Sequence, residues 1–460
     1  MRGAGADLPA YSTVPGIVWP AIPPDVGQAL LALQFQFDRS QWWTAEVLQT
    51  RQFRQLRLLI AHAVAEVPHY RDHLARAGVS SPDDIAPETF LRWPLLDKRA
   101  IQADMAGFQA KEMPAGHGHT SVVTTSGSSG EPLRATTSDA TSFVQAALVM
   151  RSHLWYGFDL RKKLCIIRTP ASPGNFPDWG PPANTAFRTG PSALLLSLEG
   201  QREQLDWLCD QRPAYLLVNS SNLWALLKES RRGERSPQGL RSIMAFGDAL
   251  PLGTRQLAHE LWQASLFDIY SASECGAIAF QCPQTQLLHV QGEHVYLEIL
   301  LEDGKPCAPG ESGRVVVTDL HNFAMPLIRY DLGDYAVRAG ACPCGRGLPT
   351  LEGILGRSTH MAVDPTGRTF FGRLNQAFWT TVAPIIQRQV VQHTPSRLEV
   401  RYVADRPLTP AEEAAIAREM RLAMRYAYEI EFTRTAEIAR NAGGKFDDFL
   451  SLLPGIVRPE

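Results

Sequence analysis

The chain of 460 residues lacks the charge imbalance that is typical of proteins that bind nucleic acid. It has 45 lysines and arginines against 47 aspartates and glutamates, which gives a formal net charge of −2. Because no basic surplus is available to neutralise a phosphate backbone, we expect no nucleic-acid partner. The sequence also has no apolar run close to the roughly 18 residues that a membrane helix needs, so we expect no membrane association.

The start of the chain lacks the apolar core of a secretory signal, because prolines interrupt it at positions 9, 15 and 20. We therefore expect a cytoplasmic protein. Seven cysteines, an odd number in a long chain, do not suggest a disulfide framework. The hydrophobic share of 45% and the charged share of 20% are ordinary for a globular protein, and this length predicts about two to three domains.

Short apolar runs alternate with amphipathic segments from about residue 140 onward. This alternation predicts a mostly parallel sheet with helices. The expected strands are 164–167, 215–218, 243–246 and 267–270, with helices at 220–231 and 254–265. Ligands of such sheets bind at the carboxyl ends of the strands, so the polar segments 246–249 and 270–274 are expected to face a ligand.

The remaining segments have other periodicities. Residues 28–77 have the three- and four-residue apolar spacing of helices. Residues 293–340 alternate with a period of two, which predicts an antiparallel sheet or a small barrel. After residue 356 a smaller unit is expected, with strands at 387–392 and 397–403 and a helix at 410–427.

Residues 124–132 form a stretch rich in glycine and hydroxyl side chains, TTSGSSGEP. Glycines let the backbone turn its N–H groups inward, and hydroxyls add donors without charge, which suits a phosphate group. A flexible Ser/Gly linker is the alternative. Three further motifs follow in order: YSASE at 270–274, YDLGD at 330–334 and GGKF at 443–446. Each motif alone is weak, but their common order and separation are much more specific.

In this order the four motifs resemble those of the adenylate-forming superfamily of acyl-CoA synthetases, adenylation domains and luciferases. The segments 55–71 and 93–98 are similar to the phenylacetate–CoA ligase branch in particular. The resemblance covers nearly the whole chain and implies an α/β fold. It implies a large AMP-binding domain at residues 1–356, with parallel sheets, helices and a small β-barrel-like subdomain, and a small mobile α+β domain at residues 357–460.

The resemblance implies ATP-dependent activation of a carboxylic acid to an acyl-adenylate and transfer of the acyl group to a thiol. An aromatic acid and coenzyme A are expected first. A phosphopantetheine carrier protein or an amine as acceptor, and an oxyacid other than a carboxylate as substrate, remain alternatives. A non-catalytic nucleotide-binding scaffold is a different class, against which the retention of Glu274, Asp331 and Lys445 argues. The oligomeric state stays open, a homodimer included.

Specific roles also follow from the resemblance. Glu274 matches the magnesium-binding carboxylate, a hard oxygen ligand that suits Mg²⁺. Ser273 matches the hydroxyl beside the α-phosphate, and Asp331 matches the carboxylate that accepts from both ribose hydroxyls. Lys445 matches the lysine that the mobile domain delivers to the reacting carboxylate and phosphate. The residues expected to contact ATP are Thr124, Thr125, Ser126, Gly127, Ser128, Ser129, Gly130, Gly247, Asp248, Ala249, Asp268, Ile269, Tyr270, Asp331 and Arg357.

The residues of the acyl-binding site have the weakest signal in the sequence. The resemblance implies that the substrate contacts lie on the segments after the expected strands, at Asn219, Ser220, Ala245 and Gly276. An aromatic wall from Trp155, Phe176, Trp179 and Phe187 is one interpretation of the stretch that precedes them, and ordinary packing is the other.

The chain departs from the family pattern at two places. Glu131 follows the last glycine of the phosphate loop, where the family usually carries a lysine there or slightly later. Ser358, Thr359 and His360 follow Arg357, where an acidic hinge residue is usual. The cation missing from the loop must therefore come from elsewhere, and we expect Mg²⁺ and Lys445 to supply it.

A separate group of residues suggests a metal site. Cys282 and His289 are followed by Cys342 and Cys344 in a segment with proline and glycine. Three thiolates and one imidazole make a tetrahedral zinc set that leaves no open position, so a structural zinc is expected. Members of the branch often carry this pattern. Cys275 is an alternative ligand.

Overall fold

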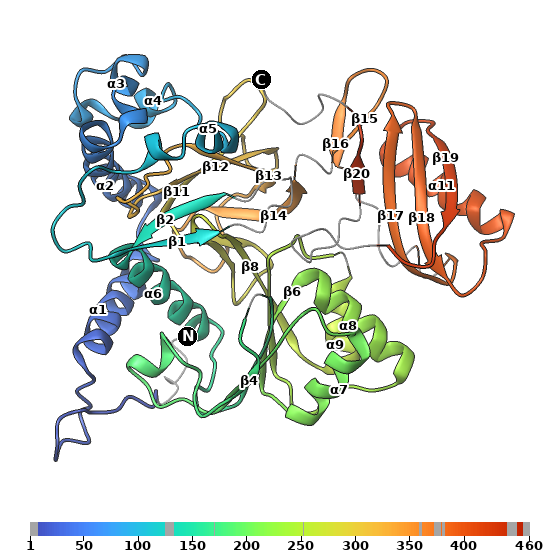
Figure 1. The fold of residues 1–460 in the computed structure, drawn as a ribbon, viewed down its shortest axis with the longest axis horizontal. Helices are drawn as coiled ribbons and strands as arrows, with labels where there is room; N and C mark the ends of the chain where they lie inside the picture. The colour runs from blue at the N-terminus through green and yellow to red at the C-terminus, as the bar shows by residue number, and fades with distance from the viewer. Residues whose placement is uncertain are drawn as a thin grey trace.

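The computed structural model describes residues 8–124, 133–169, 171–251, 253–357, 361–371, 379, 382–438 and 449–453 (Figure 1). Its largest element is a mixed sheet of twelve strands. These are β3 (Leu164–Ile167), β4 (Gly174–Phe176), β5 (Ser192–Leu195), β6 (Tyr215–Asn219), β7 (Ser242–Phe246), β8 (Ser265–Ala272), β9 (Gly276–Gln281), β10 (Leu288–Val290), β11 (Val295–Leu300), β12 (Ser312–Asp319), β13 (Tyr330–Arg338) and β14 (Thr350–Arg357). The order across the sheet is β11-β12-β13-β14-β10-β9-β8-β7-β6-β3-β5-β4.

The parallel part of this sheet, β5-β3-β6-β7-β8, is covered on both faces. Helices α7 (Gln201–Gln211), α8 (Ser220–Gly233) and α9 (Thr254–Trp262) pack in one buried cluster with the side chain of Ala245. Helices α1 (Asp25–Ser40) and α6 (Asp139–Trp155) pack in another with Met244, the preceding residue of β7. Neighbouring residues of a strand face opposite sides of the sheet, and here helices cover both sides, so the apolar strands are buried on both faces. This arrangement confirms the expected α/β fold.

The antiparallel part continues the same sheet. Strands β8 and β9 are antiparallel neighbours joined by the short turn Ser273–Cys275. The strands that were expected in a barrel-like subdomain are therefore hydrogen-bonded to the parallel strands through this hairpin. The helices that accompany this part are α2 (Ala45–Glu66), α3 (His73–Arg76), α4 (Pro87–Phe90) and α5 (Lys98–Ala103).

The segment expected to be helical at 28–77 is divided into α1, α2 and α3. Thr44 begins α2, because its side chain accepts a hydrogen bond from Val47 N. Helix α2 ends before Val67-Pro68, where the proline removes a backbone donor and disfavours a helical conformation of the preceding residue.

A smaller α+β region lies at the C-terminal end, at the right of Figure 1. Its sheet has the order β19-β18-β17-β20, from β17 (Ile385–Thr394), β18 (Arg397–Ala404), β19 (Glu429–Arg434) and β20 (Phe449–Ser451). Helix α11 (Pro410–Met424) begins at a capping box in which Thr409 accepts from Glu412 N. A two-stranded ladder of β15 (Met361–Val363) and β16 (Thr369–Phe371) lies beside it in sequence. Among the described residues, no helix is both long and apolar enough to cross a membrane.

Candidate active site at the carboxyl ends of the parallel strands

The ends of β6 and β7 approach each other closely. Gly247 follows β7 with a φ of +90°, and a Cβ atom at this position would lie 2.5 Å from Nδ2 of Asn219 at the end of β6. Only glycine fits this conformation and this contact without strain. Beside it, the Ser221 hydroxyl donates to Asp248 Oδ2 over 2.7 Å. The structure thus brings Asn219, Gly247 and Asp248 together, as the position of the strand ends predicted.

Glu274 lies half-buried in the turn between β8 and β9, next to the exposed Ser273. The Tyr330 hydroxyl donates to Glu274 Oε1 over 3.1 Å. Burial raises the pKa of Tyr330, and the Glu274 charge raises it further, so this hydroxyl keeps its proton. The turn after β8 and the start of β13 are therefore joined side chain to side chain.

Asp331 follows Tyr330 on β13. Its Oδ1 atom accepts from Gly333 N over 2.8 Å, and Arg314 Nη1 lies 3.5 Å from its Oδ2 atom. Burial raises the pKa of Asp331, while the Gly333 amide and the Arg314 guanidinium act in the opposite direction. This desolvated carboxyl group would gain from additional hydrogen-bond donors, which a ribose diol supplies.

A third pair of contacts connects β8, β13 and β14. The Tyr270 hydroxyl donates to Asp334 Oδ2 over 2.8 Å. Oδ1 of the same carboxylate lies 3.5 Å from Arg357 Nε, at the end of β14. Sequence reasoning assigned Tyr270 and Arg357 but gave no role to Asp334, although it stands within the YDLGD motif.

Lys98 is a further residue that sequence reasoning left without a role at the site. It is the first residue of α5, whose N-cap Asp97 accepts from Ala100 N over 2.7 Å. Helix α5 is held at β13 because Asp331 N donates to Leu96 O over 2.8 Å. Burial lowers the pKa of the Lys98 ammonium, Arg357 lowers it further, and Glu274 raises it. The ammonium group therefore lies within electrostatic reach of two assigned site residues.

Other assigned residues have different surroundings. Ser220 and Ala245 are fully buried, and Ala245 belongs to the apolar cluster under α8 and α9. Ile269 packs against the apolar cluster on the other face of the sheet, under α1 and α6. The backbone N–H of Asp268 donates to Gln281 Oε1. Gly276 has a φ of +66°, and a Cβ there would meet the Gln145 side chain. Ala245 is thus a core residue in this structure, whereas Gly276 is partly exposed and lies close to α6.

The four aromatic residues considered as a wall do not form one. Trp179 and Phe187 are buried in the cluster with Tyr215, and Phe176 is exposed on the edge strand β4. Trp155 packs edge-on against His289, with ring centroids 5.9 Å apart. Ordinary packing, the alternative interpretation, accounts for Trp179 and Phe187.

Two assigned parts lie outside the described residues: the loop Thr125–Gly130 and the motif with Lys445. The strands that flank the loop are described. β1 (Thr120–Thr124) and β2 (Arg134–Ser138) form an antiparallel ladder in which Thr124 pairs with Arg134. The two ends of the assigned phosphate loop are thus fixed next to each other.

Comparison with known proteins agrees with this arrangement. The chain is 27% identical to the phenylacetate–coenzyme A ligase of Escherichia coli (strain K12) over 331 residues, which are 70% of this chain and 73% of that enzyme. It is 27% identical to the enzyme of the same name from Thermus thermophilus over 325 residues, 69% and 72% of the two chains. These similarities are consistent with the adenylate-forming superfamily. Within that superfamily the similarity is to the phenylacetate–CoA ligase-like branch, and it supports an ATP-dependent adenylate-forming ligase. No protein-family model matches the sequence.

Solved structures support the same fold. The adenylate-forming ligase described here superimposes on 2-hydroxyisobutyryl-CoA ligase in its postadenylation state with a TM-score of 0.71, at 18% identity, over 90% of this chain and 91% of that one. Against the same enzyme in its thioesterification state the TM-score is 0.59. An anthranilate–CoA ligase matches with a TM-score of 0.53 at 15% identity, over 70% of this chain and 64% of that one.

The expected zinc ligands of the ligase are brought together from three segments. Cys282 follows β9, His289 lies on β10, and Cys342 and Cys344 lie between β13 and β14. Their ligand atoms lie within 4.8 Å of one another. The Sγ atoms of Cys282 and Cys342 are 3.8 Å apart, and Cys344 Sγ is 3.3 Å from His289 Nε2. Cys275, the alternative ligand, is not in this group.

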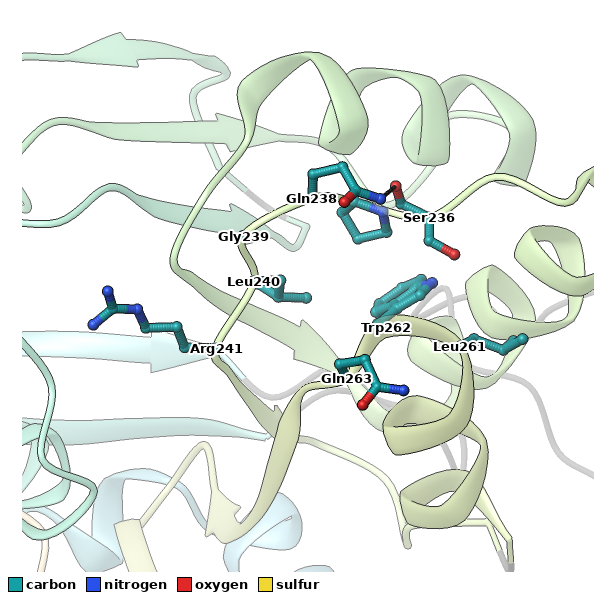
Figure 2. A pocket seen from close by; sticks show the side chains of 9 residues that line it. Ser236, Gln238, Gly239, Leu240, Arg241, Leu261, Trp262 and Gln263 are labelled. Atoms are coloured by element: carbon teal, nitrogen blue, oxygen red, sulfur yellow. Dashed lines mark hydrogen bonds between the residues drawn. The ribbon is translucent and has the colours of Figure 1, made fainter.

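A pocket of about 370 Å³ lies at the amino ends of the parallel strands (Figure 2). It is lined by segments that precede β7 and β8, around Gly239 and Trp262. The Trp262 indole donates to Ser230 Oγ over 2.8 Å beside it. Because ligands of parallel sheets bind at the carboxyl ends of the strands, this pocket at the amino ends is not the candidate active site.

Proposed function

We propose that the ligase activates a carboxylic acid, an aromatic acid in the first place, with ATP and transfers the acyl group to coenzyme A. The observation that carries the proposal is that Glu274, Asp331, Asp334 and Lys98 come from three separate segments, the turn after β8, strand β13 and helix α5, and lie near one another at the site. The similarity to phenylacetate–coenzyme A ligases over two thirds of the chain supports the reaction class.

In the first half-reaction a carboxylate oxygen of the substrate attacks the α-phosphorus of ATP. The bond from that phosphorus to the bridging oxygen breaks, and pyrophosphate leaves with the bonding electrons. Two anions must approach each other, so the protein has to neutralise charge and align the attack. We assign the ribose hydroxyls to Asp331 and the charge between carboxylate and phosphate to Lys445, which lies outside the described residues.

In the second half-reaction a thiolate attacks the acyl carbon of the adenylate. The carbon–oxygen bond to AMP breaks, AMP leaves as the anion, and a thioester is formed. The site must exclude water from the adenylate until the thiol binds, because water would hydrolyse it. Coenzyme A is the proposed acceptor, and a phosphopantetheine carrier protein or an amine is the alternative.

Lys98 fits the cationic role that the phosphate loop leaves open. Glu131 stands where the family usually carries a lysine, so the loop itself offers no lysine to the phosphates. The Lys98 ammonium is half-buried, and the negative charge of Glu274 attracts it. We therefore assign Lys98 to the phosphates of ATP, as an addition to the roles expected of Mg²⁺ and Lys445.

Two metal ions fit the residues present. Glu274 is a half-buried carboxylate oriented by Tyr330, the hard oxygen ligand that Mg²⁺ prefers, and Mg²⁺ would supply charge neutralisation at the phosphates. Zinc fits Cys282, His289, Cys342 and Cys344. With a Zn–S distance near 2.3 Å, tetrahedral sulfurs lie about 3.8 Å apart, which matches the Cys282–Cys342 separation of 3.8 Å. Burial lowers the pKa of His289 to about 4, so its ring is neutral, as a zinc ligand must be.

Acid-dependent release of pyrophosphate tests the proposal. The purified protein, ATP and Mg²⁺ are combined with a panel of aryl, alkyl and hydroxy acids, and thioester formation is measured with coenzyme A and with a phosphopantetheine carrier protein. Fast release with aryl acids and a coenzyme A thioester are expected. A carrier-bound product would identify the alternative acceptor. No pyrophosphate release with any acid would refute adenylation.

A further inference from the structure

A second group of metal-ligating side chains lies beneath the turn that carries Glu274. His294 precedes β11, Asp319 ends β12, and His321 follows two residues later. Their ligand atoms lie within 4.8 Å of one another. His294 and Asp319 are 0% exposed. We propose that His294, Asp319 and His321 bind a divalent transition-metal ion of the zinc class.

The distances suit a shared ion better than direct hydrogen bonds. His294 Nδ1 lies 3.5 Å from His321 Nδ1 and 3.6 Å from Asp319 Oδ1. Both distances, one between two nitrogens and one between nitrogen and oxygen, exceed about 3.2 Å, the long end of a normal N–H···O hydrogen bond. Two ligands that each bind zinc at 2.0–2.1 Å lie about 3.3–3.4 Å apart in a tetrahedral site, close to the observed values.

The tautomer of His294 also supports a bound ion. Its Nε2 atom lies 2.9 Å from the carbonyl oxygen of Cys275, which can only accept, so Nε2 carries a proton. In the neutral ring Nδ1 then presents a lone pair to a carboxylate and to another imidazole nitrogen. Groups whose lone pairs converge need a proton or a metal ion between them, and the separations of 3.5 and 3.6 Å are long for a shared proton. A histidine that donates its other N–H to a backbone carbonyl is the usual arrangement of a metal ligand.

Asp319 provides an independent observation. Its Oδ1 atom accepts from His321 N over 2.9 Å, but its Oδ2 atom, fully buried, has no hydrogen-bond partner among the described residues. An unsatisfied buried carboxylate oxygen is costly. A bound cation removes this cost, and the carboxylate is a ligand that borderline divalent ions accept together with two imidazoles.

The ion would act through the hydrogen bond from His294 to Cys275. Cys275 is the last residue of the turn and follows Glu274 directly, so a fixed imidazole holds the backbone of the proposed magnesium ligand. The inference does not depend on the substrate or on the acceptor of the ligase.

Metal content of the full-length protein tests the site. After loading with Zn²⁺ and removal of free ions, we expect about two zinc ions per chain, one for each cluster. The variant Cys342→Ser should keep one of them. The double variant Cys342→Ser with Asp319→Asn should keep none, as should Cys342→Ser with His321→Gln. X-ray absorption of zinc in the Cys342→Ser protein should show nitrogen and oxygen ligands without sulfur.

His153→Gln is the matched control. His153 is a buried histidine whose Nδ1 atom also has no partner among the described residues, but it is in neither cluster, so this variant should keep both ions. A Cys342→Ser protein that holds no zinc after loading overturns the proposal. A second ion that persists in the Asp319→Asn and His321→Gln backgrounds also overturns it. If the double variants do not fold, the ion count and the ligand spectrum of Cys342→Ser alone decide.

Discussion

Two sets of charged pairs in the large sheet differ in how completely they are satisfied. Arg329 lies against Glu298 with two contacts of 2.9 Å, and its Nη1 atom donates to the carbonyls of Leu91 and Trp93. Both charged side chains are buried. At the candidate active site, by contrast, the pairs Arg314–Asp331 and Arg357–Asp334 are held only at 3.5 Å.

The difference separates a closely hydrogen-bonded pair in the core from more widely spaced pairs at the proposed ATP site. A buried pair with short hydrogen bonds is a structural element, and loss of one partner leaves an uncompensated charge. A pair held at 3.5 Å retains electrostatic attraction but little hydrogen bonding, so its members can turn to a ligand at low cost. The loose pairs are those at the carboxyl edge, where the ATP site is proposed. Changes to the two sets should therefore affect different measurements.

The largest effect on activity is expected for Lys445→Ala. If this lysine bridges carboxylate and phosphate in the transition state, adenylation should fall about 100- to 1,000-fold, as for loss of one transition-state donor. ATP affinity and thermal stability should change little. Acid-dependent pyrophosphate release, with calorimetric ATP binding as the control, measures this. Unchanged adenylation would remove Lys445 from the mechanism.

The largest effect on stability is expected for Arg329→Met. The substitution leaves Glu298 buried without its partner, so the free energy of unfolding should fall by about 3–5 kcal/mol. Denaturant unfolding followed by fluorescence measures it. The double variant Arg329→Met with Glu298→Leu removes both charges and should recover part of the loss. If the single variant is as stable as the parent protein, the distinction between closed and loose pairs fails.

Asp331→Asn should raise the KM for ATP with little loss of stability. The amide keeps the shape but loses the charge, and a hydrogen bond to a charged group contributes roughly 1.5–3 kcal/mol, which corresponds to about a 10- to 150-fold change. A comparison of ATP with 2′,3′-dideoxy-ATP separates the ribose contact from general damage. The parent protein should discriminate between these nucleotides, and the variant should not.

The smallest effect is expected for Lys98→Ala. A half-exposed cation close to the phosphates should contribute about 1 kcal/mol, or roughly fivefold in the KM for ATP, and the effect should shrink at high salt. The exposed neighbour Arg99 on the same helix provides the control variant Arg99→Ala. Equal effects of the two substitutions would mean that Lys98 contributes only to the general field of the helix.

The sequence predicted the parallel strands well because each is a short apolar run buried on both faces. The predicted strand at 243–246, for example, is β7 at Ser242–Phe246. A run without polar residues does not tell which face each side chain takes, so the surroundings of Ala245, a predicted acyl-site residue, could not be derived from sequence. The structure puts Ala245 under α8 and α9.

Lys98 and Asp334 could not be assigned from sequence, because their roles depend on contacts between distant segments. Leu96 pairs with the backbone of β13 more than 230 residues later, and this long-range contact helps to bring Lys98 near Glu274. Tyr330 and Asp334 lie within the YDLGD motif, but their partners Glu274 and Tyr270 are distant in sequence. The motif alone therefore could not predict these contacts. Likewise, the group His294, Asp319 and His321 has no recognisable spacing and is defined only by the pairing of β11 with β12.

The ladder of β1 and β2 has a consequence for how this protein can diverge. Thr124 and Arg134 are paired across the ladder, so the ends of the intervening segment meet whatever its composition. Lengthening such a connection costs little, about 0.6 kcal/mol for a doubling of its length. Folding therefore constrains the length of the connection between Thr124 and Leu133 only weakly, whereas Leu133 itself is fully buried in the core.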